Sequence, residues 1–238
     1  MTGIDAAEFP DCPGRRLPAG FPDVPGGYVE ATLELGDRRL RYRRPAAPDR
    51  MLDLPEVVAA FDRDGDAPYW PLQWPPAEAM ARAVYRAGWP REATILEVGC
   101  GIGLASLAAA ARGSRVTVSD NQSDAVRLAV ANAALNDLDV EGYLLDWRTP
   151  IEARYDRILG CEVIYDATLH APLLGLLNQM LSPGGEAWLA DHGRMHTPLF
   201  AERAKTAGFA VSLVDELDQP LAAFRTAEYQ LLKLRRMP

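Results

Sequence analysis

The sequence of 238 residues is poor in the side chains that build disulfide scaffolds and metal clusters. It has three cysteines, Cys12, Cys100 and Cys161, which are widely spaced and form no CxxC pair, and only three histidines. An odd number of separated cysteines disfavours a disulfide framework and a structural zinc site, so we expect no metal centre. The same cysteine usage fits a reducing compartment.

Long apolar runs are also lacking. No stretch approaches the roughly 18–20 residues that cross a membrane, and residues 1–10 do not have the basic-then-apolar pattern of a secretory signal. We therefore expect a cytoplasmic protein that does not bind membranes. The net charge of −8 disfavours duplex nucleic acid as a partner, because phosphate binding needs clustered cations. An acidic surface instead favours a basic partner.

The residues that are present have the balance of a globular protein, with 48% hydrophobic and 24% charged side chains. Residues 1–27 are rich in proline and glycine and form an arm without a core of its own. Residues 28–35 and 38–44 flank the turn Gly36-Asp37 and predict a β-hairpin. Five arginines lie within 38–44. They indicate either a site for an acidic ligand or, as we prefer, a charged and solvated edge strand that prevents aggregation.

The rest of the chain alternates strand and helix patterns. A short helix is expected at 52–61, and the Pro/Trp-rich segment 68–89 leads into a helix from about residue 77. Strands are predicted at 94–98, 115–120, 141–146, within 155–165, and at 186–192, 210–217 and 227–235, and helices at 104–112, 123–136, 169–181 and 198–207.

Strands that alternate with crossover helices predict a doubly wound α/β fold, with a mostly parallel sheet and helices on both faces. The last two strands have no helix between them and should pair antiparallel. We divide the chain into an arm, hairpin and short helix at 1–67 and a main domain at 68–238.

The sharpest local motif runs from Glu97 through Gly99, Cys100 and Gly101 to Gly103, between a strand and a helix. Glycines there allow a tight turn and a close backbone approach, and the helix that follows offers free N–H groups to a ligand. The spacing is GxGxG and not the GxGxxG of dinucleotide-binding proteins, which disfavours a nicotinamide oxidoreductase. Asp120 ends the next strand, where an acid commonly holds two ribose hydroxyls.

At these residues the sequence resembles the class I S-adenosylmethionine (SAM) methyltransferases. The acid and glycine pattern of that superfamily matches Glu97, Gly99, Gly101 and Gly103, and its ribose acid matches Asp120. The resemblance covers roughly residues 94–235. It implies a Rossmann-like sheet of seven strands with the last strand antiparallel, and SAM as the cofactor.

Other segments resemble methyltransferase family 16, which contains protein-lysine methyltransferases. The hairpin, PYWPLQWPP at 68–76, Asp146-Trp147 and the Glu162-to-Tyr165 motif carry the likeness, especially to the electron-transfer flavoprotein β-subunit lysine methyltransferases and bacterial nicotinamide N-methylase-like proteins. The resemblance implies that Trp74 flanks the methionine part of SAM and that Asp146 and Trp147 lie by its adenine. Glu162 and Tyr165 would then face the acceptor nitrogen as catalytic residues.

We add Cys100, Asn121 and Cys161, which adjoin these motifs, to the predicted cofactor contacts, with both cysteines acting as small buried packing residues. Structural alternatives exist for five of these residues: a turn acid for Asp146, a solvated carboxylate for Glu162, and core aromatics for Trp74, Trp147 and Tyr165. Pro76 departs from the small residue that family 16 commonly has after Trp-Pro. The absence of an Asn-Pro-Pro-aromatic motif argues against DNA adenine or glutamine as the acceptor.

The sequence therefore predicts a SAM-dependent N-methyltransferase, most directly one that acts on a protein lysine. The first alternative keeps the reaction but transfers the methyl group to a small amine or a pyridine-like nitrogen. A protein acceptor requires an open rim around Glu162, whereas a small acceptor requires a lid, for which residues 1–27 are the candidate. A second alternative is a SAM-binding interaction module without catalysis.

Overall fold

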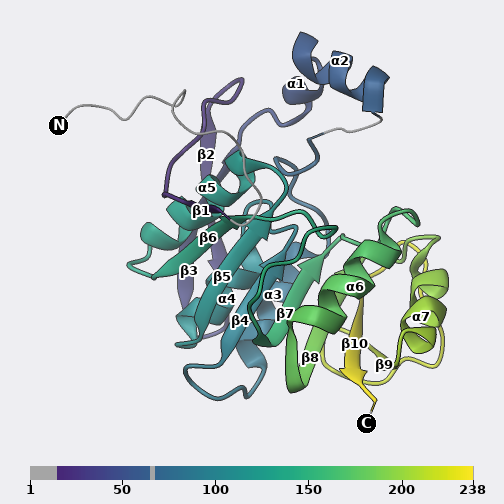
Figure 1. Cartoon of the computed structure of the whole chain (residues 1–238). Helices are drawn as coiled ribbons and strands as arrows, with labels where there is room; N and C mark the ends of the chain where they lie inside the picture. The colour runs from purple at the N-terminus through teal and green to yellow at the C-terminus, as the bar shows by residue number, and fades with distance from the viewer. Residues whose placement is uncertain (1–14, 65–67, 238) are drawn as a thin grey trace.

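The structure, a computed structural model, describes residues 15–64 and 68–237. Its centre is an eight-stranded sheet with helices on both faces (Figure 1). From one edge to the other the strands are β1 (Arg15–Leu17), β6 (Val140–Leu144), β5 (Arg115–Asp120), β4 (Thr94–Val98), β7 (Tyr155–Cys161), β8 (Leu181–Asp191), β10 (Gln230–Arg236) and β9 (Phe209–Val214). The predicted α/β fold with its seven-stranded sheet is confirmed, and the arm adds β1 as an eighth strand.

The order of the strands fixes where a ligand can bind. Strands β6, β5, β4, β7 and β8 are parallel, and β10 runs antiparallel to both β8 and β9, as predicted. From β4 the chain winds outward through β5 and β6 on one side, and through β7 and β8 on the other. Sheets of this kind bind ligands at such a switch point, outside the carboxyl ends of the strands.

Helices cover the two faces of the sheet in separate groups. The helices are α1 (Asp49–Leu52), α2 (Pro55–Asp64), α3 (Ala77–Arg86), α4 (Leu104–Ala111), α5 (Ser123–Ala134), α6 (His170–Met180) and α7 (Thr197–Thr206). Buried side chains of α3, α4 and α5 share one hydrophobic cluster, and those of α6 and α7 share the other. Neighbouring residues of β4, Ile95 and Leu96, belong to different clusters, so the strand is apolar on both faces.

Two local predictions need correction. The single helix expected at 52–61 is two helices, α1 and α2, which are separated just before Pro55 because the residue that precedes a proline disfavours helical backbone. Strand β8 begins at Leu181, five residues before the strand expected at 186–192, and includes Gly184 and Gly185. Within the described residues, no helix is both long and apolar enough to span a membrane.

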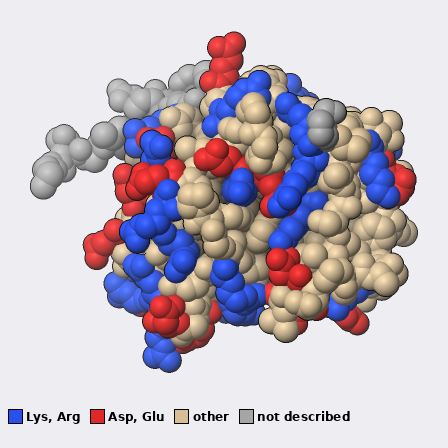
Figure 2. Space-filling view, turned by 90° about the horizontal axis from the view of Figure 1, so that it is seen from below, with Lys and Arg blue, Asp and Glu red and all other residues tan. Residues whose placement is uncertain are grey.

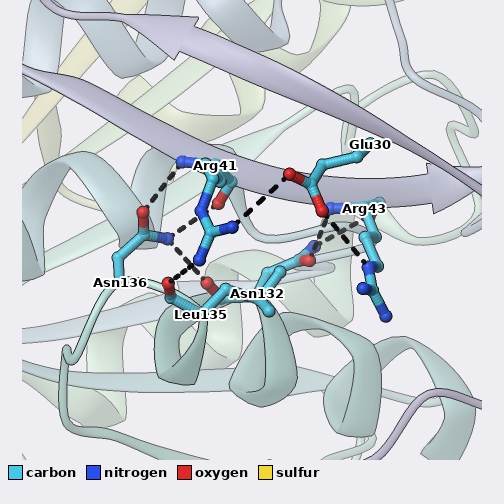
Figure 3. A network of polar contacts seen from close by, with 6 residues as sticks. All are labelled: Glu30, Arg41, Arg43, Asn132, Leu135 and Asn136. Carbon is cyan, nitrogen blue, oxygen red and sulfur yellow. Dashed lines mark hydrogen bonds and ion pairs between the residues drawn. The ribbon is translucent and has the colours of Figure 1, made fainter.

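The predicted hairpin is present as β2 (Tyr28–Glu34) and β3 (Arg39–Pro45), in a sheet of its own. The arginine side chains of strand β3 are solvated as expected, with Arg39 78% and Arg41 59% exposed, but the backbone edge of the strand is not free, because it lies along α5 (Figure 3). The side-chain amide of Asn136 accepts from the N–H of Arg41 at 2.8 Å and donates to its carbonyl at 2.7 Å. Asn132 does the same with Arg43, at 2.8 and 3.0 Å. Two amides one helical turn apart therefore replace a neighbouring strand.

The hairpin arginines are largely engaged within the protein. Arg41 and Arg43 both lie 3.6 Å from the carboxylate of Glu30 (Figure 3). Arg39 pairs with Glu34 at 3.0 Å. Basic and acidic side chains are interspersed on the face seen from below, so neither sign covers that face alone (Figure 2). Salt bridges and helix contacts are thus what these arginines supply in the described structure.

Candidate active site

A cavity lies at the carboxyl ends of β4, β5 and β7, the switch point of the sheet. Every predicted site residue except Gly103 lines it. The predicted residues in its wall are Trp74, Glu97, Gly99, Cys100, Gly101, Asp120, Asn121, Asp146, Trp147, Cys161, Glu162 and Tyr165. The fold brings these separate segments together because parallel strands end at one edge. Tyr69, Trp70, Leu72 and Arg148 also line the cavity and were not predicted.

The glycine loop after β4 has backbone that favours glycine. Gly99 has a φ of +60°, and a Cβ at this position would lie 2.8 Å from a methyl group of Val163. Gly103 has a φ of +80°, and its Cβ would lie 2.8 Å from the Cβ of Ala129 on α5. Gly103 therefore serves the packing of α4 on α5, behind the cavity wall. The loop exposes main chain to the cavity and directs the start of α4 toward it.

Two buried carboxylates hold this loop in place. Asp120 accepts hydrogen bonds from the N–H groups of Gly101 at 3.1 Å and Gln122 at 3.0 Å. Glu97 accepts one from the N–H of Ser106 on α4 at 3.0 Å. Burial removes hydration from the charged forms, which raises the pKa of Asp120 to about 6 and the pKa of Glu97 to about 7. A ligand that donates hydrogen bonds to these carboxylates would favour their charged forms.

Asp146 and Trp147 follow β6 and form another wall of the cavity. Asp146 accepts a hydrogen bond from the N–H of Arg148 at 2.8 Å and pairs with its guanidinium at 3.4 Å, so it also acts as a turn acid. The ring of Trp147 adjoins the glycine loop, since a Cβ at Gly99 would lie 3.7 Å from its Cζ2. A flat apolar ring beside a carboxylate suits a purine with an exocyclic amino group.

Glu162 is held more tightly than the sequence indicated. Its side chain is only 2% exposed, and its backbone has a φ of +57°, which is uncommon for a residue with a side chain. The carboxylate accepts the N–H of His192 at 2.7 Å and pairs with Arg194 at 2.5 Å. Burial raises the pKa of Glu162, and both partners oppose that rise by stabilising the charged form. The solvated strand-end carboxylate that was the alternative does not describe this residue.

Arg194 is the main feature that sequence reasoning missed. It lies in the loop between β8 and α7, and its guanidinium carbon is 5.2 Å from the ring centroid of Trp74. Tyr69 links the aromatic side chains here, with its ring centroid 6.1 Å from both Trp74 and Tyr165. No local motif predicts a site role for Arg194, because its partners Glu162 and Trp74 lie far away in the sequence. Tyr69 belongs to the Pro/Trp-rich segment 68–89, five residues before Trp74. That nearness in the sequence could have indicated that Tyr69 belongs to the site.

The two cysteines among the predicted cofactor contacts have the surroundings of packing residues. Burial raises the pKa of both Cys100 and Cys161 well above the ordinary range, so these thiols stay neutral and fit the predicted packing role. Cys12 lies outside the described residues. His192, whose N–H donates to Glu162, does not line the cavity but borders a separate hollow between α3 and the segment before β10.

The cavity has the donor and acceptor pattern that SAM requires. A ribose with two hydroxyls needs an acceptor such as Asp120, an adenine ring needs a flat wall such as Trp147, and the polar tail needs exposed main chain such as the glycine loop. A Cβ at Gly101 would lie 3.2 Å from the carbonyl oxygen of Trp70, so larger residues would narrow this space. These side chains therefore fit the cofactor.

Comparisons with known proteins agree with this geometry. A family model described as lysine methyltransferase matches residues 82–198, just under half of the chain. A TehB-like SAM-dependent methyltransferase from Corynebacterium glutamicum has a similar structure, with a TM-score of 0.58 and 18% identity, over 79% of this chain and 99% of that one. No curated protein sequence matches at a significant level.

Two further structures share the fold. The ribosomal protein L11 methylase of Lactobacillus delbrueckii subsp. bulgaricus is 20% identical with a TM-score of 0.54, over 68% of this chain and 78% of that one. The tRNA (uracil-54, C5)-methyltransferase of Pyrococcus abyssi, solved with S-adenosyl-L-homocysteine (SAH), is 17% identical with a TM-score of 0.55, over 87% of this chain and 44% of that one. The family match and the cavity together support a SAM-dependent methyltransferase, and the solved structures show that the chain shares the class I methyltransferase fold.

Proposed function

We propose that this methyltransferase transfers the methyl group of SAM to an amine nitrogen, and that the amine is the side chain of a protein lysine. The observation that carries the proposal is the pairing of a buried carboxylate, Glu162, with the aromatic side chains Trp74 and Tyr165 in the cavity that contains the glycine loop. A carboxylate and aromatic faces are the groups that bind an ammonium ion. The family model described as lysine methyltransferase supports the same acceptor.

The cofactor half of the site consists of the glycine loop, Glu97, Asp120, Asp146 and Trp147. In the proposal, Asp120 accepts the ribose hydroxyls, Asp146 accepts the adenine amino group, and Trp147 packs on the ring. Glu97 supports the start of α4 through Ser106. Bound SAM supplies an electrophilic methyl group on a cationic sulfur.

The acceptor half consists of Trp74, Glu162 and Tyr165. A lysine amine has to lose a proton before its nitrogen attacks, so the site must first bind the cation and then release a proton to water. Glu162 binds the cation, and the Tyr165 hydroxyl orients the nitrogen lone pair toward the methyl group. Positioning of this kind accounts for about 7–11 kcal/mol of barrier reduction in well-oriented systems.

An open rim favours a protein acceptor over a small one. Tyr69 is 37% exposed and Tyr165 is 41% exposed, so a long side chain can reach the cavity from outside. The described part of the arm does not cover them, because β1 pairs with β6 and Gly20 bonds to Arg127 on α5. None of residues 15–27 lines the cavity, and residues 1–14, the rest of the candidate lid, lie outside the described residues.

The test uses radiolabelled SAM and a desalted extract of the source cells, supplemented with pooled small metabolites. We expect the purified protein to label one protein band, and we expect Glu162→Gln to lose at least about 100-fold in labelling while it keeps its SAH affinity. Gln is preferred to Ala because it keeps the side-chain shape at this strained position. Label confined to the low-mass fraction would assign a small amine as acceptor, and unchanged labelling by Glu162→Gln would remove Glu162 from the mechanism.

A further inference from the structure

The acceptor half of the site already contains a cation. The Nη2 and Nε atoms of Arg194 both lie 2.5 Å from the same carboxylate oxygen of Glu162, Oε2. The guanidinium lies over the ring of Trp74. A carboxylate and an aromatic face are the two partners that the proposed function assigns to the acceptor amine. Arg194 therefore makes the contacts that an incoming ammonium would need.

In the Glu162–Arg194 pair the carboxylate is buried and the guanidinium is partly exposed, so another cation can replace Arg194. The Glu162 side chain is 2% exposed, and its other oxygen is held by the N–H of His192, so the carboxylate stays in place. The Arg194 side chain is 37% exposed and extends from a loop, so it can swing into water. Arginine stays charged at all physiological pH values, so only competition by another cation, and not its own deprotonation, would displace it.

The backbone of Glu162 supports a functional origin for this arrangement. A left-handed φ of +57° at a non-glycine residue costs energy, and such residues persist where the surrounding structure requires the orientation of the side chain. The strain turns a charged side chain inward, to a cavity rim where its nearest cation comes from another loop. A bridge that only tied two loops together would not need a buried carboxylate facing a ligand cavity.

We propose that Arg194 occupies the acceptor-cation position of the resting enzyme, and that the acceptor is a cationic amine that displaces it from Glu162 and Trp74. Arg194 is then a specificity-determining residue. A free small amine has few other contacts with which to displace it, whereas a lysine on a protein surface gains extra binding energy from its surroundings. This inference rests on the proposed function and adds to it the residue with which the acceptor competes.

The test measures binding of n-butylammonium, which mimics the lysine side chain, and of n-butanol, its uncharged analogue. Binding is followed by NMR of the tryptophan indole N–H signals, with and without saturating SAH. If Arg194 leaves its position at Glu162 and Trp74 in only about a tenth of the wild-type molecules, removing Arg194 raises the affinity for n-butylammonium about tenfold. We therefore expect this gain in Arg194→Gln, no gain for n-butanol, and loss of the gain in Glu162→Gln/Arg194→Gln.

The matched control is Arg203→Gln, which removes the same charge from an exposed arginine of α7 outside the cavity. It should leave n-butylammonium affinity unchanged. Equal or weaker binding by Arg194→Gln, or an equal gain in the control, would overturn the inference. If Arg194→Gln does not fold, Arg194→Lys replaces it, because Lys keeps the charge but loses the two-pronged contact. We then expect a gain of about threefold, and no gain would overturn the inference.

The two proposals fail in different ways. Absence of SAH binding or of methyl transfer would refute the proposed function, whereas the affinity comparison needs neither SAH nor turnover. With an identified acceptor, Arg194→Gln should lower KM and leave kcat largely unchanged. A residue that only positioned Glu162 would show a lower kcat in this variant instead.

Discussion

The two halves of the proposed active site are built in different ways. The cofactor half is formed by strand ends and the turns that follow them, so neighbouring residues in the sequence act together: Glu97 with the glycine loop, and Asp146 with Trp147. The acceptor half is formed by side chains from distant segments, with Glu162 after β7, Trp74 before α3, and Arg194 after β8. A motif that is local in sequence can be recognised before folding, whereas a contact between distant segments cannot.

The halves also differ in what holds them. In the cofactor half, buried carboxylates accept main-chain N–H groups, so the loop is fixed whichever side chains surround it. In the acceptor half, a carboxylate pairs with an arginine that is partly exposed. The first arrangement is suited to one invariant ligand, and the second to a partner that has to be admitted and released.

The largest expected effect is on the free energy of unfolding, which burial of Glu97 in the cofactor half lowers as pH rises. The pKa of Glu97 is about 7 in the folded protein, above its ordinary value of 4.5. The folded protein therefore retains a proton that the unfolded chain releases, and the free energy of unfolding falls as pH rises from about 4.5 to about 7. Glu97→Gln should remove about 3 kcal/mol of this loss, measured by urea denaturation of the SAM-free protein at pH 5 and pH 8. Asp120, whose pKa is also raised, to about 6, leaves a smaller slope of the same sign in the variant, so a slope equal to that of the wild type would contradict the assignment to Glu97.

Asp120→Asn should separate the two halves. It removes a charged acceptor from the proposed ribose position, and hydrogen bonds to charged groups contribute about 1.5–3 kcal/mol each. We expect SAH affinity to fall about 100-fold by calorimetry, while n-butylammonium affinity stays within about twofold. Asp139→Asn, at an exposed acid, is the control. Equal loss of both affinities would mean that the halves are not independent.

Asn132→Ala should show whether the hydrogen bonds of Asn132 on α5 stabilise the glycine loop of the cofactor half. The buried Nδ2 of Asn132 donates to the carbonyls of Arg43 in the hairpin and Ile102 in the glycine loop, both at 3.0 Å. Loss of these bonds should lower the free energy of unfolding by about 2 kcal/mol, measured by urea denaturation, and weaken SAH binding. Asn136→Ala is the comparison, since it contacts the same hairpin without reaching the loop and should leave SAH affinity unchanged.

The smallest effect is expected for Trp147→Phe, which keeps an aromatic ring but reduces its area against the proposed adenine. SAH affinity should fall about threefold to tenfold in a fluorescence or calorimetric titration. Trp89→Phe, a matched change at a tryptophan that packs against Trp188 outside the cavity, is the control. A wild-type affinity for Trp147→Phe would favour the alternative interpretation of Trp147 as an ordinary core aromatic.

The sequence allowed most of the main fold to be predicted. Strand β4 at Thr94–Val98 and β5 at Arg115–Asp120 lie at the predicted residues, because short apolar runs between turn residues have few other uses. The eighth strand was not predicted, since Arg15–Leu17 has no strand pattern of its own and is extended only because β6 offers a free edge. The packing of β3 on α5 was missed for a similar reason, because one asparagine in a helix and another just after its end are no recognisable signal for a docked strand.

For this protein, the sequence alone determined the order of strands and helices from β4 onward, the glycine loop and the carboxylates that follow the strands. These features depend on local backbone preferences and on periodicity, which neighbouring residues encode. Tertiary structure alone decided that Arg194 meets Glu162 and Trp74, and that Gly103 packs against α5 rather than lining the cavity. Contacts of that kind depend on where separate loops end in space, and that position is set by the packing of the whole sheet and its helices.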